Sequence, residues 1–409
     1  METLQKKKIN NIIIFITIGI YLFFGNIANY SIYSNLSIIL LVSVSFIYIL
    51  NNKKIYLNIY FLLYVIFMIY QLFLVFSGRA VYEHETMSVL QTMLINLVIL
   101  ICLYNVIIYT RDMKGFIKAY IFVSTLSLGV IMFLLRGNLF SGRLAHSWGE
   151  DSISYYFLGK PIAMSSNGIA FFSSIAALFS IYFFIKENKK IYLILAIFLM
   201  FGVILTGSRK GILVLALYIV FIINLMFKRK IALKLLIISV IIGGIWILIT
   251  NIPAFYNIIG ERLVDLINLF FGETTTEGSI VARERFKSYA LDWINQRPWM
   301  GYGSGAFKYV YGNVTESNYL EMMVSGGIIG TILYYLYTIP VVNRFIKAKE
   351  KDNILKILFF IVISLLIVDY GSVTYLSRSC LIVIIMYLTY LKIIKINSES
   401  DGRNGRNNK

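Results

Sequence analysis

Apolar runs of helical length follow one another along almost the whole chain. Of its 409 residues, 59% are hydrophobic and 14% are charged, whereas a soluble domain is normally about half apolar and a quarter charged. One bilayer crossing needs about 20 apolar residues. The composition therefore excludes an ordinary soluble domain and predicts an all-α polytopic membrane protein with about 12 transmembrane helices. The predicted spans are residues 9–29, 33–50, 55–77, 88–109, 117–135, 162–185, 191–207, 212–227, 231–252, 318–342, 354–370 and 375–394.

The charges between these runs predict how the chain is oriented. With the N-terminus in the cytoplasm, both termini are cytoplasmic, and 25 basic and 7 acidic residues lie inside against 13 of each sign outside. The net charge of +18 then lies wholly on the cytoplasmic side, as the positive-inside rule expects. This distribution explains the basic composition without a nucleic-acid partner. We predict one membrane domain over residues 1–409, which ends in a cytoplasmic tail at 396–409.

The longest predicted loop, residues 253–317, lies outside, between the ninth and tenth spans. Apolar residues recur in it at helical spacing and predict an amphipathic helix over residues 282–296, either on the outer membrane surface or packed on the helix bundle. The residues of the predicted apolar face are Phe286, Tyr289, Ala290, Trp293 and Ile294. Pro298 prevents the helix from continuing. The glycines that follow, Gly301, Gly303 and Gly305, indicate tight turns or a close approach of the backbone to a ligand.

Three short motifs resemble those of the bacterial O-antigen ligase and polysaccharide polymerase superfamily, which consists of integral-membrane glycosyltransferases. Together they cover roughly residues 190–340. The first is similar to the family's T-x-S-R-x-G element, the second to its N-P-L-x-G-x-G segment, and the third to its H-N-x-Y-L-E block and the glycines after it. In this chain they read Thr206-Gly207-Ser208-Arg209-Lys210-Gly211, Arg297-Pro298-Trp299-Met300-Gly301-Tyr302-Gly303, and Glu316-Ser317-Asn318-Tyr319-Leu320-Glu321 followed by Gly326-Gly327-Ile328-Ile329-Gly330.

The resemblance implies an enzyme of the bacterial inner membrane that acts on its extracytoplasmic side and uses an undecaprenyl-diphosphate-linked glycan as donor. Ligases of the family usually have histidine at the position of Glu316, which favours a repeat-unit polymerase of O-antigen or capsule type. A ligase that transfers finished glycan to a lipid remains the nearest alternative. A lipid-linked oligosaccharide flippase is less favoured, because polarity gathers in one long external loop rather than within the helices. Membrane lipid, a flippase and a chain-length regulator are the other implied partners.

Arg209 and Arg283 are the candidates that would bind the donor's diphosphate, since guanidinium forms paired hydrogen bonds with phosphate oxygens. Lys210 and Arg285 are the next candidates. The alternatives are that Arg209 only reaches the membrane interface and that Arg283 lies on a solvated helix face. Two adjacent cations on the outer side, however, run against the charge bias of membrane proteins.

Glu316 is the candidate base that takes the proton of the acceptor hydroxyl, and its alternative role is to stabilise a helix N-terminus. Asp369 is a further candidate base. Trp299 and Tyr302 are predicted to stack on a sugar face.

Other residues favour structural roles. Glu321 is expected to form a capping pair with Asn318, and the small-residue spacing of Gly326 and Gly330 predicts helix packing. The two histidines, His84 and His146, lack the spacing of a zinc site. The chain also lacks the paired carboxylates with which other glycosyltransferases bind a divalent metal. We therefore expect a metal-independent enzyme without a cofactor.

Overall fold

The computed structural model describes residues 2–27, 32–136, 166–226, 278–348 and 351–407, together with isolated residues between 156 and 161 and between 234 and 264. Within these ranges, 8 helices are long and apolar enough to cross a membrane, and Asn11–Ile27 and Lys190–Leu205 form shorter apolar helices. The predicted all-α polytopic fold is confirmed. The predicted span at 231–252 lies largely outside the described residues, as does the loop around His146, so the number of spans stays a prediction.

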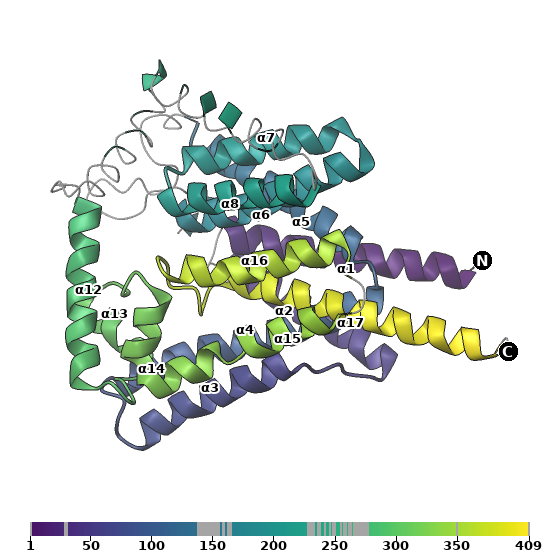
Figure 1. Ribbon diagram of the computed structural model, residues 1–409. Helices are drawn as coiled ribbons and strands as arrows, with labels where there is room; N and C mark the ends of the chain where they lie inside the picture. The colour runs from purple at the N-terminus through teal and green to yellow at the C-terminus, as the bar shows by residue number, and fades with distance from the viewer. Residues whose placement is uncertain are drawn as a thin grey trace. The chain divides into compact units, whose positions relative to one another are not determined.

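The chain divides into two compact units. Unit 1 comprises residues 1–41 and 113–275. Its helices are α1 (Glu2–Ile27), the first part of α2 (Ile32–Asn52), α5 (Met113–Leu134), α6 (Ser166–Glu187), α7 (Lys190–Leu205) and α8 (Arg209–Met226), and two short strands, β1 (Tyr156–Phe157) and β2 (Lys160–Pro161), pair antiparallel. Helices α7 and α8 both pack on α6, which is largely buried (Figure 1). This three-helix packing brings the start of α8 beside the start of α6.

Unit 2 comprises residues 42–112 and 276–409. It contains the remainder of α2, α3 (Ile59–Phe76), α4 (Glu83–Thr110), α12 (Gly278–Gln296), α13 (Ala306–Tyr311), α14 (Asn318–Tyr335), α15 (Thr338–Lys347), α16 (Asn353–Asp369) and α17 (Arg378–Asn407). Helix α3 packs on α4 and α14, and α17 packs on α4 and α16.

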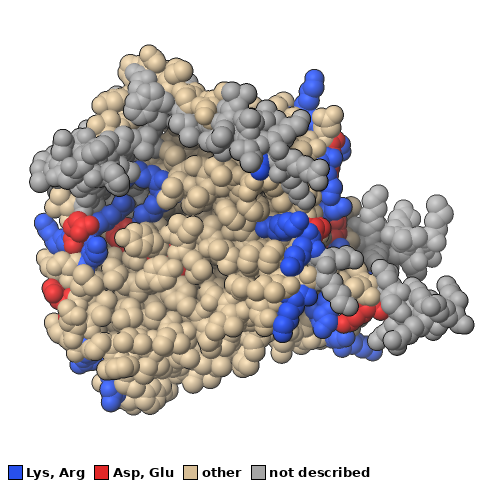
Figure 2. Space-filling model, viewed as in Figure 1, with Lys and Arg blue, Asp and Glu red and all other residues tan. Residues whose placement is uncertain are grey.

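On the face shown in Figure 2, Lys, Arg, Asp and Glu gather near helix ends, and the stretches between are formed by other residues. This separation suits helices whose middle parts lie in lipid.

Helix α17 continues through the segment predicted as the cytoplasmic tail. It has 30 residues, whereas a bilayer crossing needs about 20. The polar residues after Ile396 therefore extend the helix beyond its apolar part.

The amphipathic helix predicted at 282–296 is part of α12, which packs on the bundle rather than standing alone on a membrane surface. Its apolar face contributes Ala290 to a buried cluster that also contains Tyr302, Ala306, Phe307 and Val324. The helix lies crosswise to α3 and α14 (Figure 1). The residues predicted for this face, Phe286, Tyr289, Trp293 and Ile294, are partly buried against the cluster. Packing of aromatic side chains thus fixes α12 on α13 and α14.

Helix α14 is broken at Gly327, whose φ of 63° and ψ of −163° are not helical. The loop after α12 enters this break. Tyr302 N donates to Val324 O at 2.8 Å and Gly303 N to Ser325 O at 2.9 Å, while Ile328 N donates to Pro298 O at 2.8 Å. These bonds satisfy backbone groups that the break leaves without helical partners, as a membrane interior requires. The predicted span at 318–342 is therefore two helical segments of α14 followed by α15.

The glycines of this region allow two backbones to touch. A Cβ atom at Gly327 would lie 2.2 Å from the carbonyl carbon of Trp299, and one at Gly301 would lie 2.5 Å from Val324 O. The close approach foreseen for the glycine-spaced loop is thus to another segment of the same chain. Gly326 and Gly330 face Tyr70 of α3, where a Cβ would lie 3.3 and 3.0 Å from its ring, in keeping with the predicted helix packing.

Candidate functional site

Arg283 and Glu316 form an ion pair in unit 2. Arg283 Nε lies 3.5 Å from Glu316 Oε2, and the two side chains keep 33% and 29% of their surface exposed. Arg283 extends from α12, and Glu316 lies two residues before α14. A pair of this exposure adds only about 0–1 kcal/mol to stability. Its importance is chemical, because a cation suited to phosphate and a carboxylate suited to accept a proton lie side by side.

Glu316 has left-handed backbone geometry, with φ of 64°. A residue with a Cβ pays roughly 1–2 kcal/mol for this conformation, which glycine or asparagine would adopt more easily. Such strain is typical of residues held in place for a function. Thr315 and Ser317 on either side are buried, and Thr315 Oγ1 donates to Ser317 O across the strained residue at 2.8 Å.

Two buried carboxylates border this turn. Glu321, 1% exposed, accepts a hydrogen bond from Thr315 N at 3.2 Å. Asp369, also 1% exposed, accepts from Tyr335 Oη at 2.8 Å and from the Thr374 hydroxyl. Ser317 Oγ donates to the backbone carbonyl of Asp369 at 3.3 Å. The turn that carries Glu316 is therefore bonded to α14 on one side and to the end of α16 on the other.

The predicted capping pair between Glu321 and Asn318 is not formed. Asn318 Nδ2 donates to Tyr335 Oη at 2.9 Å and to Asp369 Oδ2 at 3.3 Å. Its Oδ1 accepts from the amides of Thr374 and Tyr375. Because Ser317, not Asn318, is the N-cap of α14, the glutamate reaches back past it to Thr315. Sequence reasoning missed Tyr335 and Thr374. Tyr335 lies 34 residues from Asp369 along the chain, so only packing brings the two together, and Thr374 bonds to Asp369 from the turn after α16, which has no sequence motif of its own.

The other candidates of the long loop differ in accessibility. Arg285 is exposed on α12, and Trp299 keeps 65% of its surface, so both can meet a ligand. Tyr302 is 8% exposed. Its ring lies 4.5 Å from that of Trp293 and 4.9 Å from the guanidinium of Arg297. Tyr302 is thus packed among side chains of the loop and of α12, and its stacking on a sugar stays a prediction.

Arg209 and Lys210 occupy the first turn of α8 in unit 1, and the motif around them explains their placement. Gly207 has a positive φ of 56°, which turns the chain between α7 and α8. Ser208 Oγ accepts from Gly211 N at 3.1 Å and donates to Asn167 Oδ1 at 2.6 Å. A Cβ at Gly211 would lie 2.3 Å from that of Ala170, so this glycine lets α8 approach α6 closely.

The start of α8 combines two basic side chains with a helix N-terminus. The N-terminus of a helix carries a partial positive charge, and Arg209 and Lys210 add two more positive charges to it, with no acidic residue in the first turn of α8. Helix stability alone disfavours this placement, whereas binding of phosphate at the helix N-terminus favours it. Both side chains are partly buried.

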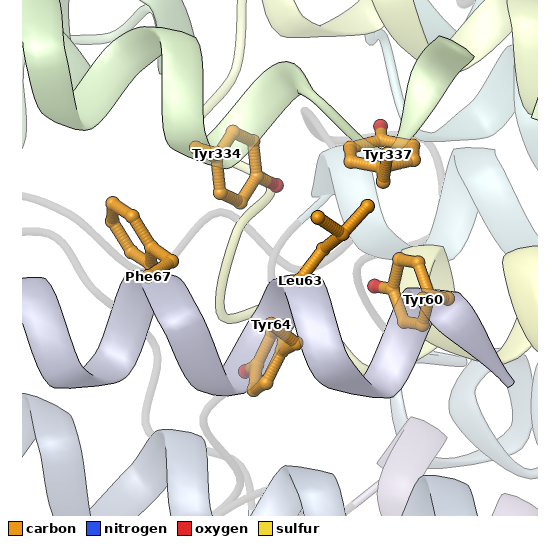
Figure 3. Close-up of a pocket in the computed structure, with 6 residues that line it drawn as sticks. All are labelled: Tyr60, Leu63, Tyr64, Phe67, Tyr334 and Tyr337. Atoms are coloured by element: carbon orange, nitrogen blue, oxygen red, sulfur yellow. The ribbon is translucent and has the colours of Figure 1, made fainter. Parts of the chain in front are cut away.

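A small cavity in unit 2 is not a substrate site. It lies between α3 and the junction of α14 and α15, lined by Tyr60, Leu63, Tyr64, Phe67, Tyr334 and Tyr337 (Figure 3). Its volume of ≈ 10 Å³ holds about one water molecule. Among the described residues, no group of three or more His, Cys, Asp or Glu side chains is arranged to hold a metal ion.

Comparison with known proteins places both candidate regions in one family segment. Residues 192–335 match the family model described as O-antigen ligase. No curated protein matches the chain. The matched segment contains Arg209, Arg283 and Glu316, and the resemblance drawn from the three motifs is confirmed. Over residues 192–335 this membrane protein is thus similar to the O-antigen ligase and polymerase superfamily, whose members are glycosyltransferase-like enzymes.

Proposed function

We propose that this protein is a polysaccharide repeat-unit polymerase of the outer side of the bacterial cytoplasmic membrane. It transfers a glycan from an undecaprenyl-diphosphate carrier to the terminal sugar of a second lipid-linked unit. The observation that carries the proposal is the ion pair between Arg283 and Glu316 within the family segment. The proposed polymer is of O-antigen or capsule type.

Each group has one role in the transfer. Glu316 accepts the proton of the acceptor hydroxyl as its oxygen attacks the anomeric carbon of the donor sugar. The bond between that carbon and the phosphate oxygen breaks, and undecaprenyl diphosphate leaves with the bonding electrons. Arg283 stabilises the negative charge that gathers on the diphosphate. In the structure the anionic partner of Arg283 is Glu316. The donor's phosphate would replace Glu316 as that partner, so the guanidinium that binds the phosphate would already lie beside the base.

Arg209 is proposed as a second guanidinium that contacts the donor diphosphate, and Lys210 and Arg285 as cations that bind the substrate. Trp299 is proposed to contact sugar, because it is exposed on the loop that enters the break in α14. A flippase that delivers the lipid-linked units and a regulator of chain length are the proposed partners. Both termini are proposed to be cytoplasmic.

Ligation is the second candidate function, favoured by the description of the matching family as O-antigen ligase. A ligase would use the same cations and base but would transfer finished glycan to a lipid acceptor. Glu316 in place of the histidine expected of ligases favours the polymerase.

The test is an assay with purified protein in lipid bilayers and lipid-diphosphate-linked repeat units, with and without a chelator of divalent metals. A ladder of longer lipid-linked glycans is expected in both conditions. A single product on an added lipid A acceptor would identify a ligase. If the glycans stay unchanged but cross the bilayer, the protein is a transporter. Loss of the ladder with chelator would contradict metal independence.

Replacing Arg283 or Arg209 with lysine should lower kcat by about 10²–10³-fold. Lysine keeps the charge but loses the planar fork that binds two phosphate oxygens. Lys287→Arg, an exchange on the exposed face of α12, is the matched control and should leave kcat unchanged. The rate of ladder formation per folded molecule is the measurement. Normal kcat in either arginine variant would remove that residue from the diphosphate site.

A further inference from the structure

We infer that Glu321 is a positioning residue, which holds the turn that carries Glu316 so that the proposed base stays beside Arg283. The inference rests on the proposed function, since it concerns how the base of that reaction is held. It starts from the strained backbone of Glu316, whose φ is 64°. A single residue in this geometry persists only when the groups around it fix the chain.

The carboxylate of Glu321 fixes the residue before the base. Its Oε2 accepts from Thr315 N at 3.2 Å, and Thr315 Oγ1 in turn donates to Ser317 O at 2.8 Å. The two bonds tie Thr315, the residue before Glu316, to the buried carboxylate of Glu321 and to the carbonyl of Ser317, the residue after Glu316. Because the carboxyl oxygen is buried and bonded to the Thr315 amide, and an acceptor of the same shape could make the same bond, Glu321 is well suited to this task.

Glu321 also lies on α14, the helix that packs against α12, and α12 carries Arg283. It lies in the first turn of α14, and Leu320 and Val324 on that helix contact the apolar face of α12, from which Arg283 extends. Glu321 therefore connects the turn of Glu316 to the helix pair that positions the guanidinium. At 1% exposure it is shielded from solvent, whereas Glu316 keeps 29% of its side chain exposed. The accessible carboxylate can meet a substrate, and the buried one holds it in place.

The test compares Glu321→Ala with Glu321→Gln, each measured as kcat and KM per folded molecule. Alanine removes the acceptor of the Thr315 amide, and kcat should fall by about 10²-fold, the effect of displacing a reacting group by about 1 Å, with KM unchanged. Glutamine keeps a carbonyl oxygen at the same place and should restore most of kcat. If both variants lose kcat equally, the charge of Glu321 matters and positioning through the amide is wrong. Normal kcat in the alanine variant also overturns the inference.

A double variant separates positioning from general loss of structure. Once Glu316 is glutamine, nothing is left for Glu321 to position. The double variant Glu316→Gln and Glu321→Ala should then have the same kcat as Glu316→Gln, because residues that act as a unit have non-additive effects. Multiplied losses would assign Glu321 a merely structural role and overturn the inference. Where Glu316→Gln has no measurable rate, the comparison of alanine with glutamine at position 321 decides by itself.

Asp352 provides the matched control. Its carboxylate also accepts a backbone hydrogen bond in unit 2, from Leu355 N at 2.9 Å. Asp352 caps the start of α16, however, and the turn of Glu316 is bonded to the opposite end of that helix, at Asp369. Asp352→Ala should leave kcat per folded molecule unchanged.

Different results would contradict Glu316 as the base and Glu321 as the positioning residue. Full activity in Glu316→Gln removes the proposed base, whereas normal kcat in Glu321→Ala, with Glu316→Gln inactive, removes only the positioning role.

Discussion

Replacing Glu316 with glutamine should lower kcat for glycan transfer by about 10²–10⁴-fold, the usual contribution of general acid–base catalysis. Glutamine has nearly the same shape but cannot take up the proton of the acceptor hydroxyl. KM for the donor should change little, because Arg283 loses only a partly exposed ion pair. The measurement is the initial rate of ladder formation from lipid-linked repeat units, with the amount of folded protein determined for each variant.

Glu284→Gln is the control for this experiment. Glu284 is exposed on α12, next to Arg283 in sequence, and its loss should leave kcat unchanged. Glu316→His should retain part of the activity, since an imidazole also accepts a proton near neutral pH. Full activity in Glu316→Gln would show that the base lies elsewhere, and Asp369 would then be the next residue to test.

Replacing Gly327 with alanine should prevent unit 2 from reaching its folded state. The new Cβ would lie 2.2 Å from the carbonyl carbon of Trp299 and 2.4 Å from Met300 N. Both atoms belong to backbone that is hydrogen-bonded to α14 and cannot move aside cheaply. The backbone geometry, with φ of 63°, adds strain of roughly 1–3 kcal/mol for a residue with a side chain. We expect little folded protein in detergent, measured by size exclusion and by thermal unfolding.

Gly312→Ala separates the cost of backbone strain from that of steric overlap between the new Cβ and neighbouring backbone. Gly312 also has a positive φ, 69°, but no atom lies within 4 Å of a Cβ built on it. Its alanine variant should therefore be destabilised only by the backbone cost of left-handed geometry, roughly 1–2 kcal/mol, and should fold with a slightly lower melting temperature. Equal stability of the Gly312 and Gly327 variants would mean that the loop does not fill the break in α14.

Helix positions and the amphipathic segment could be predicted because they depend on local pattern. Hydrophobicity over about 20 residues indicates a membrane helix wherever that helix packs. In the same way, the spacing of Phe286, Tyr289, Ala290, Trp293 and Ile294 indicated one apolar face before its partners were known. The motifs near Arg209 and Glu316 also indicated the family, since they are short stretches of contiguous residues. None of these inferences needed a contact between distant parts of the chain.

The break in α14 and the surroundings of Glu316 depend on contacts between segments far apart in sequence. Two adjacent glycines in an apolar run are compatible with a continuous helix. The helix opens at Gly327 because backbone bonds with Pro298, Tyr302 and Gly303 replace helical ones. In the same way, the short-range pattern paired Glu321 with Asn318, but each found a better partner, Thr315 in one case and Asp369 in the other. Local composition thus specifies which segments are helical, while the choice of buried hydrogen-bond partners is made only when the segments pack together and lose water.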